Sequence, residues 1–141
     1  MKLYAGRRRR IATSIGAVVL ALALVPVLAQ AFKSGTYSGD TSQGQSLQLK
    51  VNKAKTKVTV VFFEFVAPPC GGMGGLQYAG LTGKLRNSGK FRVLSPADGY
   101  YGYVKGKFEH HSADGTALYH YDPSGCNSGE VTWTAERSSP D

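Results

Sequence analysis

The strongest constraint on the fold is a two-residue apolar period that recurs in short segments separated by glycine-rich turns. In SLQLKVN, Leu47, Leu49 and Val51 alternate with polar residues, and the segment GEVTWTAER at 129–137 alternates in the same way. Such alternation is typical of strands with one buried and one wet face. After residue 31, no long stretch shows the 3.6-residue period of an amphipathic helix. We therefore predict one all-β domain, an antiparallel β-sandwich or β-barrel of about seven or eight strands.

Turn residues mark the limits of the expected strands. The segment KVTVVFFEFVA at 57–67 is the most apolar, which indicates burial on both faces or a bulge that shifts the alternation near Val60. The lysine-rich stretch 50–57 is typical of a turn between two strands. The expected strands lie at 35–42, 46–52, 57–67, 76–82, 90–95, 101–111, 116–122 and 129–137.

The first 31 residues have the three parts of a secretory signal peptide. A basic stretch with Lys2 and Arg7–Arg10 precedes the apolar run IGAVVLALALVPVL at 15–28, and a small-x-small site ends at Ala31. The run is short for a spanning helix, which needs about 20 apolar residues. We expect cleavage near Ala31 and a protein that is secreted or held at the cell envelope. The alternative is an uncleaved anchor, in which this segment alone would contact the membrane.

Removal of this segment leaves a β-domain over 32–137 and a short frayed tail over 138–141. Five of the 17 basic residues and none of the nine acidic residues lie in the segment, so 12 basic and nine acidic residues remain. A nucleic-acid-binding surface needs a dense basic patch. A small excess of positive charge spread over the domain does not supply one, and we expect no nucleic-acid partner.

Two cysteines, Cys70 and Cys126, both lie in turn-like surroundings. In an exported protein a disulfide is the default state of such a pair. Closing a loop of this length is expected to stabilise the domain by about 4 kcal/mol. A redox pair or thiolate metal site is disfavoured because the chain has no C-x-x-C spacing.

The stretch FEHHSADGTALYHY at 108–121 holds all three histidines. Asp114-Gly115 lies between two alternating segments, which is typical of a two-residue hairpin turn. A hairpin with this turn would place Glu109 opposite His120 and would direct His110 toward the core.

The same register predicts that Glu109, His111 and His120 share the outer face of the hairpin. Two imidazoles and a carboxylate can hold zinc or iron. Lys107 on the same face would repel a cation, so the favoured interpretation is a solvated face, and the metal site is the minor alternative. No G-x-S-x-G motif and no paired carboxylates point to other catalysis, and we expect neither enzymatic activity nor a cofactor.

The segment DGYYGYVKG places three tyrosines, Tyr100, Tyr101 and Tyr103, around one turn. Alternation directs Tyr101 and Tyr103 to the face opposite Val104. Outward tyrosines can stack on sugar rings or contact a protein, since they combine apolar area with a polar tip. The simpler interpretation is that they cover the rim of the core.

Four segments together resemble a known family: GTYSGDTSQGQSLQLKVN, KVTVVFFEF with a following cysteine, ADGTALYH and CNSGEVTWTAER. They are similar to a small exported domain of high-GC Gram-positive bacteria with the pattern G-x-Y-x-G-x-T-S-Q-G … C-x-S-G-x-V-x-W-x-A. The resemblance covers nearly the whole chain after the signal segment and implies export and an all-β fold. Its shared residues belong to turns and strands, so it implies no activity, and the three histidines lie outside the pattern.

These observations predict a non-enzymatic binding or interaction module outside the cell or at its envelope, with a cell-wall polysaccharide or another envelope protein as partner. A fainter similarity to avidin- and lipocalin-like barrels suggests a barrel that binds a small apolar ligand. That alternative requires an enclosed apolar cavity larger than about 300 Å³. A metal-dependent enzyme on the 109–120 hairpin is the other alternative.

Overall fold

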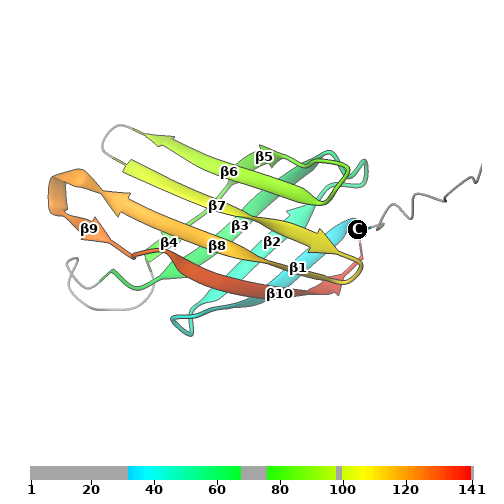
Figure 1. Ribbon diagram of the computed structural model, residues 1–141, viewed down its shortest axis with the longest axis horizontal. Helices are drawn as coiled ribbons and strands as arrows, with labels where there is room; N and C mark the ends of the chain where they lie inside the picture. Colours follow the sequence, from blue (N-terminus) through cyan, green and yellow to red (C-terminus); the bar gives the residue numbers. More distant parts are fainter. Residues whose placement is uncertain (1–31, 68–75, 98–99, 141) are drawn as a thin grey trace, which may run out of the picture.

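The computed structural model describes residues 32–67, 76–97 and 100–140, which form a nearly closed antiparallel barrel of eight strands (Figure 1). The predicted signal segment and Cys70 lie outside these residues. Within the described ranges, no helix is long and apolar enough to cross a membrane. The predicted all-β fold is confirmed, and of the two predicted forms, sandwich or barrel, the structure has the barrel.

The strands follow the expected segments closely. One expected strand, 76–82, is two short strands separated at Ala79 and Gly80, and the last strand continues two residues past 137 into the expected tail. A short 3-10 helix at Asp122–Ser124 precedes a two-residue strand. The strands are β1 (Gly35–Thr41), β2 (Ser46–Val51), β3 (Lys57–Phe65), β4 (Leu76–Tyr78), β5 (Leu81–Lys84), β6 (Lys90–Ala97), β7 (Tyr100–Glu109), β8 (Ser112–Tyr121), β9 (Cys126–Asn127) and β10 (Val131–Ser139).

Strands that are adjacent in the chain are mostly adjacent in the barrel. The hydrogen-bonded order is β4-β3-β2-β1-β10-β8-β7-β6, and β5 also pairs with β3. β5 and β6 meet through a bridge between Leu85 and Phe91. A Cβ atom on Gly83 would lie 2.8 Å from the backbone oxygen of Arg92, so the two strands approach closely there. This contact nearly closes the barrel.

A bulge in β3 keeps its apolar side chains on the inner face. Gln48 pairs with Phe62 and Leu49 with Val60, so Val61 is the extra residue. Val60 and Phe63 are consequently both buried, although they are three residues apart. Of the two expected explanations of the continuous apolar run, the bulge near Val60 is confirmed, since an unbroken alternation would turn half of these residues outward.

Trp133 fills one part of the interior and is only 2% exposed. Its ring lies against Gly106 and Gly115, which face each other on β7 and β8. A Cβ atom on either glycine would lie 2.7 Å from Cζ2 of the indole. Two glycines therefore make the space that the tryptophan occupies.

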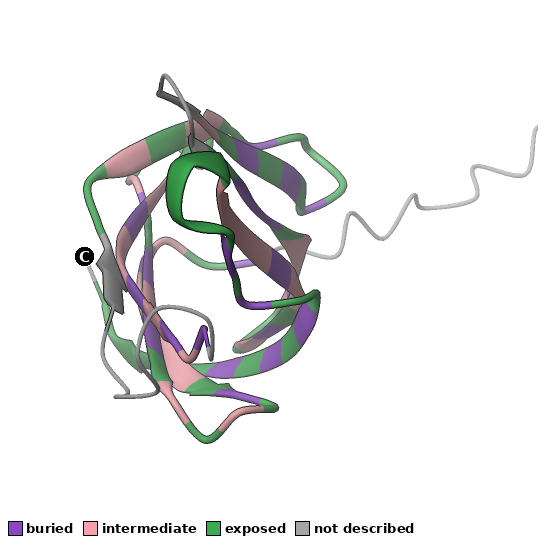
Figure 2. Ribbon diagram, turned by 90° about the vertical axis from the view of Figure 1, so that its left-hand side faces the viewer, coloured by how far each residue is buried: buried purple, intermediate pink, exposed green. Residues whose placement is uncertain are grey.

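Aromatic rings continue through the barrel. Tyr37 and Phe91 pack on Phe108 with ring centroids 4.7 and 5.0 Å apart. Near the other end of β8, Phe65 stacks on Tyr119 at 4.3 Å. Figure 2 shows buried and exposed residues alternating along the strands. The described part of the interior is thus packed with large side chains.

The predicted register of the β7–β8 hairpin is wrong. Glu109 pairs with Ser112, so the turn is formed by His110 and His111, four residues before the expected Asp-Gly turn. His110 has a positive φ of 24° and is exposed, where we expected it to face the core. Gly115 lies in the middle of β8 instead, because Trp133 needs the space beside it.

Candidate anion-binding site

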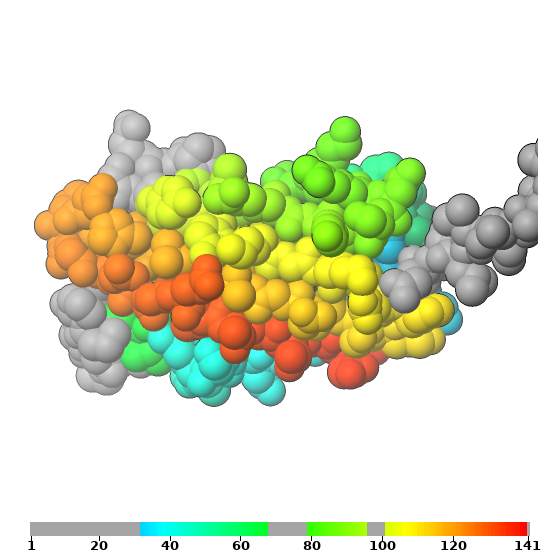
Figure 3. All heavy atoms as spheres, viewed as in Figure 1, coloured from blue at the N-terminus to red at the C-terminus, as the bar shows by residue number. Residues whose placement is uncertain are grey.

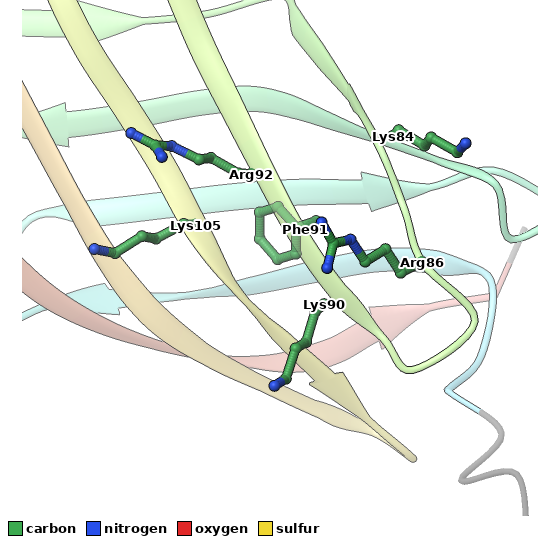
Figure 4. Close-up of a pocket in the computed structure, with 6 residues that line it drawn as sticks. All are labelled: Lys84, Arg86, Lys90, Phe91, Arg92 and Lys105. Atoms are coloured by element: carbon green, nitrogen blue, oxygen red, sulfur yellow. The ribbon is translucent and has the colours of Figure 1, made fainter.

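A hollow of about 510 Å³ on the outer wall of the barrel is surrounded by positive charge (Figure 4). Figure 4 shows Arg92 and Lys105 extending to the same side, while the amine of Lys84 points the other way. We call this hollow the basic pocket. It is lined by Lys84, Arg86, Lys90, Phe91, Arg92 and Lys105, and none of these residues is acidic.

A shallower hollow of about 340 Å³ extends the basic pocket across β7 to β8. Lys90, Phe91 and Lys105 line both hollows. The extension adds Lys107 and one carboxylate, Asp114. Figure 3 shows the residues of β6, β7 and β8 forming one continuous face. The two hollows therefore adjoin each other on one wall, and cations predominate among their lining residues.

The strand registers force like charges together on this wall. Lys90 pairs with Lys107, and Arg92 pairs with Lys105, on adjacent outward positions of β6 and β7. Like charges directly opposite each other destabilise a sheet. This arrangement is unfavourable for folding alone, which makes it a candidate for function.

Two carboxylates balance part of this charge. Glu109 lies 2.5 Å from the amine of Lys107, and Glu130 lies 3.5 Å from the amine of Lys105. The other cations of the basic pocket make no ion pair within the described part of the chain. They are Lys84, Arg86, Lys90 and Arg92.

Tyr103 connects the basic pocket to the neighbouring surface. The Cζ atom of Arg92 lies 5.4 Å from the centroid of its ring, and the amine of Lys105 lies 4.7 Å from it. Both are cation–π contacts. The Tyr103 hydroxyl donates a hydrogen bond to the carboxylate of Glu130. This bond is the main cause that raises the pKa of Tyr103 and lowers the pKa of Glu130, so Glu130 is negatively charged at neutral pH.

The tyrosines predicted to face outward do so, but only one offers a free ring. Tyr103 is 8% exposed and lies between its strand partners Leu94 and Leu118, whereas Tyr101 is 50% exposed. The two rings are in edge contact, with centroids 6.3 Å apart. Tyr100 begins β7, and its side chain lies outside what the structure describes.

The candidate metal ligands do not come together. His120 pairs with Tyr101 near one end of the β7–β8 hairpin, and Glu109 pairs with Ser112 at the other. Eight residues of strand separate Ser112 from His120, or about 26 Å. His111 lies in the turn. Their predicted convergence depended on the register and is wrong with it.

Each of these residues has another partner. The Nε2 atom of His120 lies 2.5 Å from Oδ1 of Asp122, and that of His111 lies 3.2 Å from the amine of Lys33. In the ranges that the structure covers, no three His, Cys, Asp or Glu side chains gather as a metal site requires.

The predicted disulfide involves Cys70, which lies outside the described residues. Cys126 is 6% exposed, and its sulfur accepts a hydrogen bond from the hydroxyl of Ser124 at 2.7 Å. The Cys70–Cys126 bond stays a prediction.

One sequence pattern indicates the basic pocket but was not used in the predictions above. In KLRNSGKFR at 84–92, cations occupy every second position on both sides of Asn87–Gly89. If this segment is a hairpin, a period of two places all four cations on one face. The positive charges are therefore not spread evenly over the domain, which was the basis for expecting no basic patch.

Neither family models nor curated proteins nor solved structures supply a match to this chain, so its function is inferred from this geometry.

Proposed function

We propose that the protein is an exported, non-enzymatic binding module that holds an anionic ligand in the basic pocket. The observation that carries the proposal is the set of five cationic side chains around one hollow with no acidic lining residue. Clustered charge of one sign attracts a ligand of the opposite sign. A bound anion would also offset the repulsion between the like-charged pairs of β6 and β7.

The outer wall suits such a ligand better than the interior does. Large aromatic side chains, among them Trp133 and Phe108, pack the described part of the barrel. The signal segment predicted over residues 1–31 supports export, so the ligand we propose is an anionic component of the cell envelope or its surroundings.

Two paired variants with equal loss of charge test this proposal. Lys90→Gln/Lys105→Gln removes the two cations shared by both hollows, and Lys33→Gln/Lys53→Gln removes two exposed cations elsewhere. We expect sodium triphosphate to bind the first variant about tenfold or more weakly than the wild type, since charge-assisted hydrogen bonds contribute about 1.5–3 kcal/mol each. Isothermal titration at an ionic strength of about 0.1 M, where the Debye length is about 10 Å, measures the affinities.

The control variant should lose clearly less affinity for triphosphate, because Lys33 and Lys53 line neither hollow and make no direct contact with an anion held there. Equal weakening of both variants would show a general charge effect and would contradict the proposal. So would a wild-type protein that does not bind triphosphate at all.

A further inference from the structure

We propose that the natural ligand is an acidic polysaccharide, with one sugar ring stacked on Tyr101 and its acidic groups among the cations of the basic pocket. This inference rests on the proposed function and names the class of ligand. Its structural basis is a free aromatic ring next to the cations, joined to them through a second, covered ring.

Tyr101 has the properties of a stacking platform. Its side chain is 50% exposed, and its ring is held at an interplanar angle of 77° against that of Tyr103. Its hydroxyl makes no hydrogen bond with any residue that the structure describes. The ring can therefore pack on the apolar face of a sugar while the hydroxyl bonds to a sugar oxygen.

Tyr103 places this platform beside the basic pocket. The Tyr103 ring contacts the ring of Tyr101, and it also contacts the cationic groups of Arg92 and Lys105. A ligand that covers Tyr101 has to extend only past Tyr103 to meet these cations. A polymer whose sugar rings carry negative charges matches this order, with a ring for Tyr101 and acidic groups for the cations.

The same wall fits other polyanions less well. Only two large hydrophobic side chains are exposed in the described part of the chain, Leu94 and Tyr101. Proteins that bind single-stranded nucleic acid stack successive bases on several aromatic side chains. Binding in the membrane interface requires a broad apolar face. A single exposed ring beside a cluster of cations favours a sugar polymer.

Two polyanions, one built from sugar rings and one without them, distinguish stacking on Tyr101 from attraction between charges. Polygalacturonate carries carboxylates on sugar rings, and inorganic polyphosphate carries charge alone. We expect Tyr101→Ala to weaken polygalacturonate binding about fivefold and to leave polyphosphate binding within about twofold. Tyr101→Phe keeps the ring and should retain most of the affinity for polygalacturonate. Thermal melting confirms that each variant is folded.

The outcomes distinguish this inference from the proposed function. If the wild type binds polyphosphate but Tyr101→Ala leaves polygalacturonate binding unchanged, or weakens both probes equally, the polysaccharide inference is overturned and the anion site stands. A Tyr101-dependent preference for single-stranded DNA or for anionic lipid vesicles over polygalacturonate would also overturn it. If the wild type binds neither probe, the anion site itself is wrong.

Discussion

Replacing Trp133 with alanine is expected to lower the free energy of unfolding by about 3–5 kcal/mol, the usual loss for a buried tryptophan. Its side chain is 2% exposed and its ring packs on Phe91 at 6.1 Å. The indole nitrogen has no hydrogen-bond partner among the described residues, so we attribute the expected loss to packing. Urea unfolding followed by circular dichroism measures the change.

Thr132→Ala is the matched control for this variant, because Thr132 is the preceding residue of β10 and faces solvent. We expect it to change the free energy of unfolding by no more than about 0.5 kcal/mol. A loss below about 1 kcal/mol for Trp133→Ala would mean that the tryptophan does not hold the interior together, since buried large-to-small changes normally exceed that value.

Gly115→Ala is expected to destabilise the domain by about 1–3 kcal/mol or more, because the added methyl group overpacks the interior. Its Cβ would lie 2.0 Å from the backbone oxygen of Lys105 and 2.7 Å from the Trp133 ring. Thr116→Ala is the control: the Thr116 hydroxyl is buried and has no partner in the described ranges of the chain, so its removal breaks no hydrogen bond there. Urea unfolding of both variants gives the comparison.

A double variant shows which part of this loss comes from the tryptophan. In Gly115→Ala/Trp133→Ala the methyl group still meets the Lys105 oxygen but no longer meets the ring. The two losses should therefore sum to more than the loss of the double variant, as is usual for residues in contact. Strict additivity, or tolerance of Gly115→Ala, would contradict the close packing of β7 and β8 around the indole.

Local periodicity predicted the strands because it is a property of neighbouring residues. Leu47, Leu49 and Val51 alternate in the sequence and are all buried in β2. The bulge in β3 could be anticipated for the same reason, since an apolar run too long for one face requires a shift in the alternation.

The hairpin register could not be predicted from local signals. Asp114-Gly115 has the composition of a turn, but the glycine is required by a tryptophan 18 positions further along the chain. A glycine that gives a positive φ and a glycine that gives space look the same in a sequence. The error moved the turn by four residues and brought Glu109 and His120 together wrongly.

The basic pocket also depends on contacts between distant segments. Lys84 comes from β5, Arg92 from β6 and Lys105 from β7, and the approach of β5 to β6 brings them to one hollow. A net charge counted over the whole domain conceals such a cluster. The alternation of cations at 84–92 was readable, but only with the hairpin assumed.

The central claim, an anion site at the basic pocket, is tested most directly by a variant that should gain affinity. The negatively charged carboxylate of Glu130 contacts Lys105 and Tyr103, where it competes with an incoming anion. Glu130→Gln keeps a hydrogen-bond acceptor and removes that charge. The control is Glu136→Gln, which also removes one negative charge, but from the outer face of β10, beside Ser38 and Thr134.

Titration of both variants with triphosphate gives the decisive comparison. A charge about 5 Å away contributes on the order of 1 kcal/mol in water, so Glu130→Gln should bind triphosphate about three- to fivefold more tightly than the wild type. Glu136→Gln should show a smaller gain. An unchanged or weaker affinity in Glu130→Gln, or an equal gain in both variants, would contradict an anion site at the basic pocket.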